Sequence, residues 1–453
     1  MPSVEPAQSC SGSHETNSQD ADTQGQYLLT SLIDCAGVMR GKIVPKSRAK
    51  SVAKSGVGAS PSWALFCADN DIAWIPSITA VGDHRLRADL SAAVEIDDKL
   101  SWAPAEVYEQ EGDHGFWCSR HLLRQQCEKL AAKGIEMKVA GEMEFFLLPN
   151  DDKPIDGWQA YGVSSLLNKE EFVSEVVQTF ARLGLGLEQF HGEYGNQQYE
   201  LSLSPADPIR AMDKIALARL LLGRIARRYD CKVSFSAQPA LNSVGNGAHI
   251  HFSFTRDGKP LLSAADGPHG ISTDGGAIIA GIVDHLPELV ALLAPSVLSC
   301  ERLKPGHWAG AFACWGMENR EAAVRYCSAN PSNPYGANIE VKCIDPSANP
   351  YVACAAVLMM ANAGLEESLP LPKETTVDPA LLDETERAKG HVVQLVDSQS
   401  AILERLEQSA LAQSEFPPQM LEALVAVRRL EMKNYANKPI EETIQALRFA
   451  WSV

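Results

Sequence analysis

The sequence predicts an α+β protein with two domains. The chain has 453 residues, enough for more than one ordinary domain. Short strand-like segments run to about residue 105, and from Ser119 onward such segments are separated by longer stretches of helical spacing. Strands separated by helices indicate α+β architecture. We therefore expect a flexible tail over residues 1–25, a small N-terminal domain over residues 26–112 and a larger domain over residues 113–453.

The N-terminal region begins with a polar segment and continues in short apolar ones. Residues 1–25 are rich in Ser, Gln, Asp, Thr and Gly, with neither a basic start nor an apolar run. They fit neither a secretory signal nor a transit peptide, and we expect a flexible tail. In the small domain we expect strands and turns with one short helix, over residues 27–34, 37–45 and 71–76.

The larger domain alternates strand-like segments, around Glu142, Glu200 and His249, with helix-like ones. We expect helices near residues 120–133, 169–185, 208–229, 277–297 and 351–367, with further helical segments to the C-terminus. The most hydrophobic stretch, residues 277–298, is interrupted by charged residues and Pro287. We therefore interpret it as a helix and not as a membrane span.

The composition argues against several classes of protein. A formal net charge of −17, with no basic stretch to offset it, argues against nucleic-acid binding. No uninterrupted apolar run reaches the roughly 18 residues of a membrane span. The 11 cysteines include no Cys-x-x-Cys pair, and Cys354 is one of several in apolar helical context. Free thiols in a cytoplasmic protein fit this pattern better than disulfides.

Acidic and apolar residues alternate in the segment Gly-Glu-Met-Glu-Phe-Phe at residues 141–146. A strand places residues i and i+2 on one face, so we expect Glu142 and Glu144 to point together. Two carboxylates on one face repel each other unless a cation lies between them. A solvated face is the alternative, but the apolar run around both residues favours burial, and buried carboxylates need a partner.

Four further acidic or imidazole positions lie in strand-like segments: Glu193, Glu200, Glu340 and His249, which has His251 beside it. Hard oxygen ligands with one imidazole suit Mg²⁺ or Mn²⁺, whereas thiolates would suit zinc. A purely structural His-x-His pair is the alternative. Taken with the Glu-x-Glu pair, the set predicts a divalent-metal site in an enzyme that uses ATP.

The order of these segments resembles one family, glutamine synthetase and its relatives that join glutamate to amines. The resemblance covers roughly residues 27–453. It implies an N-terminal β-grasp domain and a C-terminal catalytic α+β barrel, in a dodecamer of two stacked hexameric rings with active sites between subunits. It also implies that ATP activates the γ-carboxylate of glutamate as γ-glutamyl phosphate, which ammonia or an amine then attacks.

The resemblance also implies the metal ligands. The family's ligand positions are matched by Glu142, Glu144, Glu193, Glu200, His249 and Glu340. Glu142, His249 and Glu340 would hold one metal and the other three glutamates the second, with Gln198 preceding Glu200. The cofactors would be ATP and two or three Mg²⁺ or Mn²⁺ ions per site.

Substrate and phosphate residues are implied in the same way. Arg302, in Arg-Leu-Lys-Pro-Gly, matches the arginine at the glutamate carboxylate, and Gly245 falls in the glutamate-binding turn. Arg320 and Arg325 match a pair that neutralises the ATP phosphates, with Ser253 near the nucleotide. A surface pair of arginines is the alternative. The implied catalytic residues are Glu193, Arg302 and Arg320, and the implied substrate-binding residues are Gly245, His249, Arg302, Trp308 and Lys342.

The chain departs from glutamine synthetases proper around the ammonium group. Where they carry a glutamate two residues after Pro-Gly, this chain has Trp308, which neither holds ammonium as an anion would nor acts as a base. Residues 56–63, where the family supplies an aspartate to the neighbouring site, contain no acid. We predict a pocket for an alkyl- or arylamine, with Glu193 binding or deprotonating it. Packing of Trp308 in a lid is the alternative.

The residues expected around the acid substrate also differ from those of glutamine synthetases proper. The family's R-x-E-x-R segment has Asn338 and Lys342 in place of its arginines, and lysine keeps the charge without the bidentate fork. Slow activity, weak glutamate binding or another acid substrate would follow. Beside the amine ligase, three readings stay open: a glutamine synthetase proper that uses ammonia, a γ-glutamylpolyamine synthetase and a catalytically silent homologue.

Overall fold

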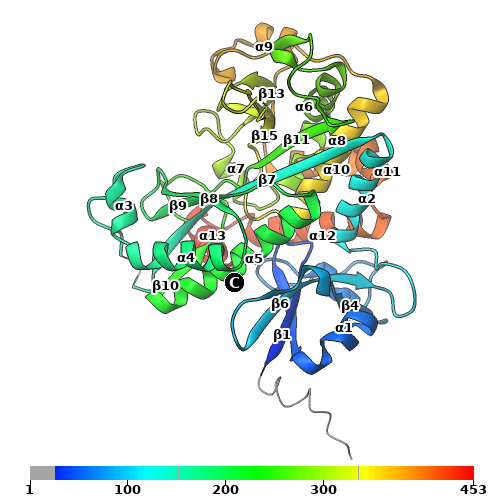
Figure 1. Cartoon of the computed structure of the whole chain (residues 1–453), viewed down its shortest axis with the longest axis vertical. Helices are drawn as coiled ribbons and strands as arrows, with labels where there is room; N and C mark the ends of the chain where they lie inside the picture. The colour runs from blue at the N-terminus through cyan, green and yellow to red at the C-terminus, as the bar shows by residue number, and fades with distance from the viewer. Residues whose placement is uncertain (1–25, 152, 335) are drawn as a thin grey trace, which may run out of the picture.

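The computed structural model describes residues 26–151, 153–334 and 336–453, which are built around two β-sheets (Figure 1). The predicted flexible tail, residues 1–25, lies outside the described residues. A six-stranded sheet forms the N-terminal part, and a ten-stranded sheet with most of the helices forms the rest. The predicted α+β class is confirmed, whereas the domain boundary at residue 112 stays a prediction.

The N-terminal sheet has the strand order β2-β1-β6-β4-β3, with β5 paired to β6. β1 runs parallel to β6, and helix α1 follows the β1–β2 hairpin, as in a β-grasp domain. In the hairpin turn, Asp34 Oδ1 accepts the N–H groups of Ala36 and Val38, and Gly37 takes a left-handed φ of 81°. The elements are β1 Tyr27–Ile33, β2 Met39–Pro45, α1 Ala49–Ser55, β3 Val57–Ala59, β4 His84–Ala88, β5 Val94–Glu95 and β6 Leu100–Tyr108.

The expectation of a strand over residues 71–76 is wrong. Residues 71–76 form only isolated bridges, at Ile72 and Ile75. Trp74 is exposed and Pro76 has no N–H to donate, so the segment has neither a buried face nor a complete hydrogen-bonding edge. Strands β3 to β6, which the sequence analysis did not single out, complete the sheet.

The ten-stranded sheet follows the order β16-β13-β14-β15-β11-β7-β9-β8, with β10 and β12 paired to β7 and β11. The 15-residue strand β7, Ile135–Pro149, crosses the molecule and pairs with β11 on one side and β9 on the other (Figure 1). The remaining strands are β8 Leu187–Gly192, β9 Gln198–Leu203, β10 Cys231–Ser234, β11 Ile250–Arg256, β12 Lys259–Pro260, β13 Phe312–Met317, β14 Ala322–Cys327, β15 Asn338–Val341 and β16 Val393–Gln394.

The five expected helices of the larger domain are confirmed as α2 Ser119–Ala132, α4 Glu170–Arg182, α5 Pro208–Ala226, α6 Thr273–Leu293 and α8 Pro350–Glu367. α6 and α8 pack closely through Gly281 and Gly364, where a Cβ would stand 2.3 and 2.1 Å from backbone oxygens of the opposite helix. α6 is long and apolar enough to cross a membrane, but 78% of that stretch is buried inside the protein. Its apolar side chains therefore belong to the core. The ten described cysteines are free thiols, as expected.

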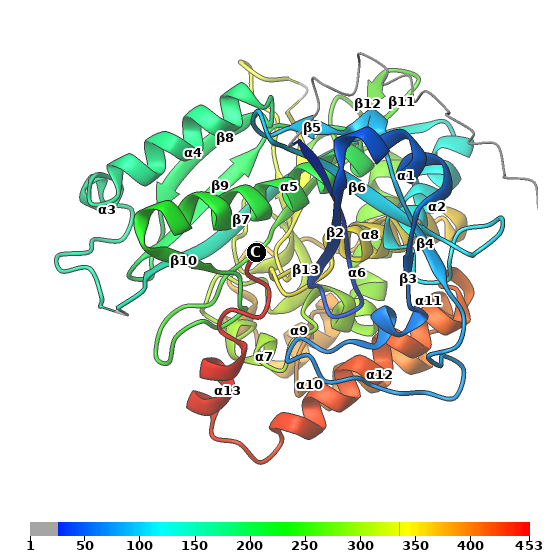
Figure 2. The same ribbon diagram turned by 90° about the horizontal axis from the view of Figure 1, so that it is seen from below.

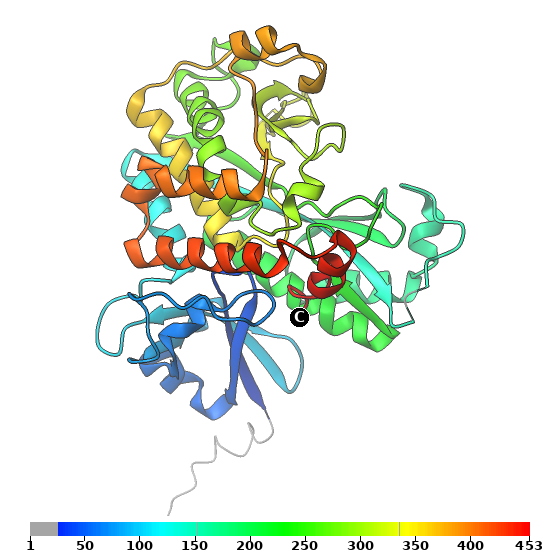
Figure 3. The same ribbon diagram turned by 180° about the vertical axis from the view of Figure 1, so that it is seen from behind.

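Residues from the second half of the chain clamp the turn after β1. Helix α12, Pro418–Tyr435, lies between the N-terminal sheet and the rest of the molecule (Figure 3), and the view from below shows it beside loops of the N-terminal part (Figure 2). Arg428 on α12 donates to Cys35 O at 3.1 Å, and the Trp451 indole donates to Ala36 O at 2.9 Å. The other helices are α3 Val163–Leu167, α7 Ser299–Arg302, α9 Glu384–Gly390, α10 Gln399–Gln408, α11 Ala410–Glu415 and α13 Ile440–Leu447.

A buried ion-pair network joins the two parts of the molecule. Arg120 on α2 lies 2.8 Å from Asp89, 2.6 Å from Glu106 on β6 and 3.0 Å from Asp213 on α5. Arg124 also contacts Glu106, at 2.6 Å. Burial disfavours the charge of Glu106, but the bond from Arg124 and the charge of Arg120 outweigh burial and lower its pKa to about 2.

We expect Arg120→Met to lower the free energy of unfolding by about 3–5 kcal/mol, because it leaves buried carboxylates uncompensated. Arg124→Met is the matched control, since the Arg124 side chain is 39% exposed. It should cost less than about 1 kcal/mol. Urea-induced unfolding at pH 7 measures both variants, and equal losses would contradict this account.

The same comparison should depend on pH. The pKa of Glu106 is about 2 in the folded protein against an ordinary value of 4.5, so its charge stabilises the fold above about pH 4.5. That contribution is lost as the pH falls from about 4.5 toward 2. Because Arg120→Met lacks part of this contribution, the difference in free energy of unfolding between wild type and variant should be constant above about pH 4.5 and should narrow as the pH falls from about 4.5 toward 2. A difference that stays constant over that fall in pH would indicate lost packing alone.

Candidate active site

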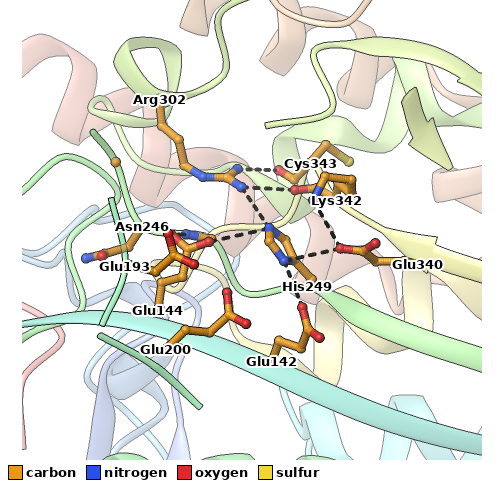
Figure 4. Close-up of polar contacts among 12 residues, drawn as sticks. Glu142, Glu144, Glu193, Glu200, Asn246, His249, Arg302, Glu340, Lys342 and Cys343 are labelled. Atoms are coloured by element: carbon orange, nitrogen blue, oxygen red, sulfur yellow. Dashed lines mark hydrogen bonds and ion pairs between the residues drawn. The ribbon is translucent and has the colours of Figure 1, made fainter. Parts of the chain in front are cut away.

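Three predicted carboxylates meet where β7 and β9 pair (Figure 4). Glu142 and Glu144 are strand neighbours i and i+2 on β7, and Glu200 lies opposite Glu144 on β9. Glu200 is buried, and the other two are partly buried. The strand alternation thus brings three like charges into the protein interior, where they destabilise one another unless positive groups intervene.

His249 joins this cluster from just before β11, and not from within the strand as expected. Its Nδ1 lies 3.2 Å from Glu142 Oε2 and 3.3 Å from Glu340 Oε1 on β15. Ligand atoms of these three side chains lie within 4.8 Å of one another, a grouping that could hold a metal ion. This is the set that the family resemblance implies for one metal.

Two further groups share this spacing. One consists of Glu144, Glu200 and His249, and the other joins Glu200 to His191 and Glu193. Glu193 therefore lies beside His191, with 3.0 Å between Oε1 and Nε2, and not in the described group that contains Glu144. His191, on β8, was missed in the sequence, although its place two residues before Glu193 is the spacing that could have found it.

The charges in the cluster are unevenly balanced. Burial raises the pKa of Glu200 well above its ordinary value, and the neighbouring carboxylates, Glu142 first, add to the effect. Burial also opposes the charge of Glu142, but the neighbouring His249 and His251 imidazoles outweigh burial and hold the pKa well below the usual range. Asn338 Oδ1, 2.8 Å from His251 Nδ1, orients that imidazole. Added positive charge is therefore most favourable at Glu200, which fits a divalent cation.

Glu340 is the best-compensated acid of the site. Lys342 Nζ lies 3.1 Å from its Oε1, and an Arg325 nitrogen lies 3.0 Å from its Oε2. Burial disfavours its charge, but Lys342 and then His249 lower its pKa to about 2. The buried Lys342, expected near the glutamate γ-carboxylate, thus points to Glu340.

The predicted glutamate-binding residues lie together. Arg302, at the end of α7, is 5% exposed and points into the site (Figure 4). Its guanidinium lies 3.4 Å from His249 Nε2 and donates to Lys342 O at 3.0 Å. A Cβ at Gly245 would stand 2.7 Å from the Arg302 side chain, so this position requires glycine. Gln198 Nε2 donates to Gly245 O at 2.9 Å and fixes the loop.

The predicted nucleotide residues are spread along the neighbouring strands. Arg325 on β14 contacts Glu340 and, at 2.7 Å, Glu318. Ser253 lies partly buried on β11. Arg320 is exposed in the turn between β13 and β14, and its pairing with Arg325 stays a prediction.

Two exposed aromatic residues, Tyr161 and Tyr194, contact Glu193, and a third, Trp308, contacts Tyr194. The Tyr161 side chain hydrogen-bonds to its carboxylate, and the Tyr194 N–H donates to Glu193 Oε2 at 2.9 Å. The Tyr194 ring meets the Trp308 ring edge-on, with centroids 6.2 Å apart. Trp308 is 53% exposed, so it is not packed into the core. Tyr194 was missed in the sequence, although it directly follows Glu193.

The N-terminal segment over residues 56–63 has an acid beside it despite containing none. A Cβ at Gly58 on β3 would stand 3.0 Å from Asp83 Oδ2. Antiparallel pairing of β3 with β4 brings Asp83 there, because β4 begins at the next residue. Only the strand register reveals this neighbour.

Comparisons with known proteins agree with this geometry. The family description "Glutamine synthetase, catalytic domain" matches residues 116–447. The γ-glutamylpolyamine synthetase GlnA3 of Streptomyces coelicolor is 33% identical over 411 residues, which cover 88% of each chain. The glutamine synthetase of Thermococcus kodakarensis is 28% identical over 391 residues, 84% of each chain.

A solved structure described as a novel glutamine synthase homologue agrees as well. It has a TM-score of 0.84 at 28% identity and covers 94% of this chain and 98% of its own. The resemblance inferred from the metal and phosphate motifs is confirmed. The chain belongs to the glutamine synthetase family and is an ATP-dependent, amide-forming ligase.

Proposed function

We propose that the protein joins the γ-carboxylate of glutamate to an organic amine through γ-glutamyl phosphate, releasing ADP and phosphate. The aromatic residues near Glu193 carry this proposal, because Tyr161 and Tyr194 contact its carboxylate and the exposed Trp308 ring extends the surface from Tyr194. The face of an aromatic ring attracts an ammonium group, and the ring also packs against apolar substituents. Such a border suits an ammonium group that carries an alkyl or aryl substituent.

Glu193 supplies the negative charge of this pocket. Burial disfavours its charge, but bonds from His191 and from the Tyr194 N–H prevail and lower its pKa. Its carboxylate therefore stays ionised at neutral pH and can hold the ammonium group. It can also accept the proton that the amine loses before its lone pair attacks. The C–N bond then forms as the bond between carbonyl carbon and phosphate oxygen breaks.

The acidic cluster supports binding of Mg²⁺ or Mn²⁺, since its ligands are carboxylates and one imidazole. We assign one ion to Glu142, His249 and Glu340, and a second to Glu144, Glu193 and Glu200, where Glu200 is the residue that shares a ligand group with each of the other two. When bound, these ions would offset the charge of the transferred phosphoryl group. Arg320 and Arg325 would face the ATP phosphates, with Ser253 near the nucleotide.

The acid substrate is bound, in this proposal, by Arg302 and the Gly245 loop. Arg302 is buried, and its guanidinium is held by main-chain oxygens, so its positive charge stays available to a carboxylate. Lys342 is engaged by Glu340 and would act through that metal ligand. Glutamate activation would then depend on Arg302 and the metal ligands together.

The assembly stays a prediction. A dodecamer of two stacked hexameric rings would place residues 56–63 of one subunit beside the site of the next. Asp83, next to Gly58, would then be the acid that this segment lacks.

γ-Glutamylpolyamine synthesis is a second candidate. The relative at 33% identity carries that name. Glu321, beside the Trp308 backbone, has a buried carboxylate oxygen without a hydrogen-bond partner among the described residues. The distal ammonium group of a diamine would bind such an oxygen. Glutamine synthesis from ammonia lacks comparable support, because Trp308 offers ammonium no anion.

An amine screen tests the proposal directly. Phosphate release with ATP, Mg²⁺ and glutamate is compared across ammonium, methylamine, isopropylamine, ethanolamine, aniline and putrescine, with product mass checked. We expect one monoamine to exceed ammonium in kcat/KM by at least about tenfold, as complementary apolar contact allows. Putrescine in first place would establish the second candidate. Ammonium in first place would overturn the proposal, and no turnover at all would indicate another acid substrate.

Trp308 should decide the amine preference. Trp308→Glu restores an anion, so we expect kcat/KM for ammonium to rise and that for the best organic amine to fall, each by about tenfold. Trp308→Phe should keep the wild-type order. Trp74→Phe is the matched control, because Trp74 is 56% exposed on the N-terminal part and should change neither value. An unchanged preference in Trp308→Glu would exclude the indole from selection.

The metal assignment predicts a selective loss of affinity. Glu142→Gln should weaken Mn²⁺ binding by at least about tenfold, since losing even an outer-shell partner typically costs that much. Glu136→Gln, at an exposed position on the same strand, is the control. Calorimetric titration of each purified variant with Mn²⁺ measures the affinity without reference to activity. Equal affinities would place the ion away from Glu142.

A further inference from the structure

The turn that carries Trp308 has an unusual backbone. Gly306 and Trp308 both take left-handed φ values, 77° and 52°. Glycine adopts this conformation freely, whereas a bulky residue is strained in it. Trp308 is half exposed, so core packing does not hold it there. Another group must therefore maintain the turn.

Glu321 is that group. It lies just before β14, is only 7% exposed, and its Oε1 accepts the Trp308 N–H at 3.0 Å. The Gly306 backbone N–H also hydrogen-bonds to its side chain. One carboxylate thus binds both left-handed residues of the turn. Removing it would release two backbone donors at once.

Glu321 is itself firmly placed. Its N–H donates to Asn319 Oδ1 at 3.1 Å, and Asn319 Nδ2 donates to Thr375 O at 2.8 Å. The charged groups facing its carboxylate are Asp378 and Lys342, of opposite sign. Burial, then Asp378, raises its pKa above the ordinary value. The carboxylate is therefore a fixed acceptor at the base of the turn.

A chain of contacts leads from this carboxylate to the amine pocket. Glu321 binds the backbone of Trp308, the Trp308 ring contacts the Tyr194 ring, and the Tyr194 N–H binds the Glu193 carboxylate. A shift of the turn would move the indole away from Tyr194. Glu193 would keep its own hydrogen bonds, so the chemistry would survive while the border of the pocket changed.

We infer that Glu321 is a positioning residue for amine selection, which holds the Gly306–Trp308 turn so that the indole stays against Tyr194 beside Glu193. The role of Glu321 in amine selection rests on the proposed function, whereas its role in holding the turn does not. Glu321 contacts backbone and not substrate in this role. The carboxylate acts as a latch for an aromatic side chain.

Hydrogen exchange tests the latch without any substrate. We compare wild type with Glu321→Ala, and with Glu321→Asp, which keeps the charge but withdraws the oxygens by one methylene. In both variants the amides of Gly306 and Trp308 should exchange at least tenfold faster. Glu321→Gln should stay within threefold of wild type, because its carbonyl oxygen can accept the same N–H. Unchanged exchange in Glu321→Ala and Glu321→Asp would overturn the latch.

Kinetics test the selection. Glu321→Asp should raise KM for the best amine about tenfold and lower the amine-to-ammonium ratio of kcat/KM by the same factor, with KM for ATP within twofold and kcat within threefold. Glu321→Gln should restore the wild-type ratio. A loss of kcat with unchanged amine KM would overturn the inference, since it would indicate a general structural role.

Glu374→Ala is the matched control. Glu374 also accepts a backbone N–H at this edge of the sheet, from Met317 at 3.0 Å, but does not touch the turn. It should leave both exchange and amine preference unchanged. If wild type turns over no organic amine, the proposed function fails, while the exchange rates at Gly306 and Trp308 still decide the latch.

Discussion

Mutual repulsion among buried carboxylates is the constraint on which the active site depends. Glu142, Glu144 and Glu200 are brought together by ordinary strand pairing, and no local rearrangement of side chains can separate them. Compensating charge must therefore come from other elements, and β11, β14, β15 and the residues beside them supply it. His249 enters from the start of β11, while Lys342 follows β15 and binds the last acid of the set.

Local sequence patterns were sufficient for most of the scaffold. The alternation around Glu142 predicted both the strand and its polar face, because the side-chain period of a strand is two residues. The apolar spacing of α5 and α8 predicted long buried helices. The family resemblance grouped Arg302, Gly245 and His249 in one site, and the structure places these residues in contact, while their roles stay predictions.

What the sequence did not reveal depends on contacts between distant segments. Residues 71–76 have apolar character but no strand partner, and partners are chosen by the whole sheet. Asp83 neighbours Gly58 only through the β3–β4 register. Glu321 looks like a surface acid beside Arg320, and its burial beneath residues 306–308 depends on how two loops meet. Polar side chains that hydrogen-bond to the backbone of a distant segment produce no periodic pattern in the sequence.

The hydrogen bonds that hold the turn after β1 join segments that are translated at different times. Cys35 and Ala36 are translated well before their hydrogen-bond donors, since Arg428 follows Cys35 by 393 residues and Trp451 follows Ala36 by 415. The small N-terminal sheet can form as soon as its strands are complete, but α12, against which it packs, has not yet been translated. Until α12 has been translated, the N-terminal sheet is attached to the growing chain without the helix against which it packs. Nascent chains therefore complete these contacts between their two parts only after Arg428 and Trp451 have been translated.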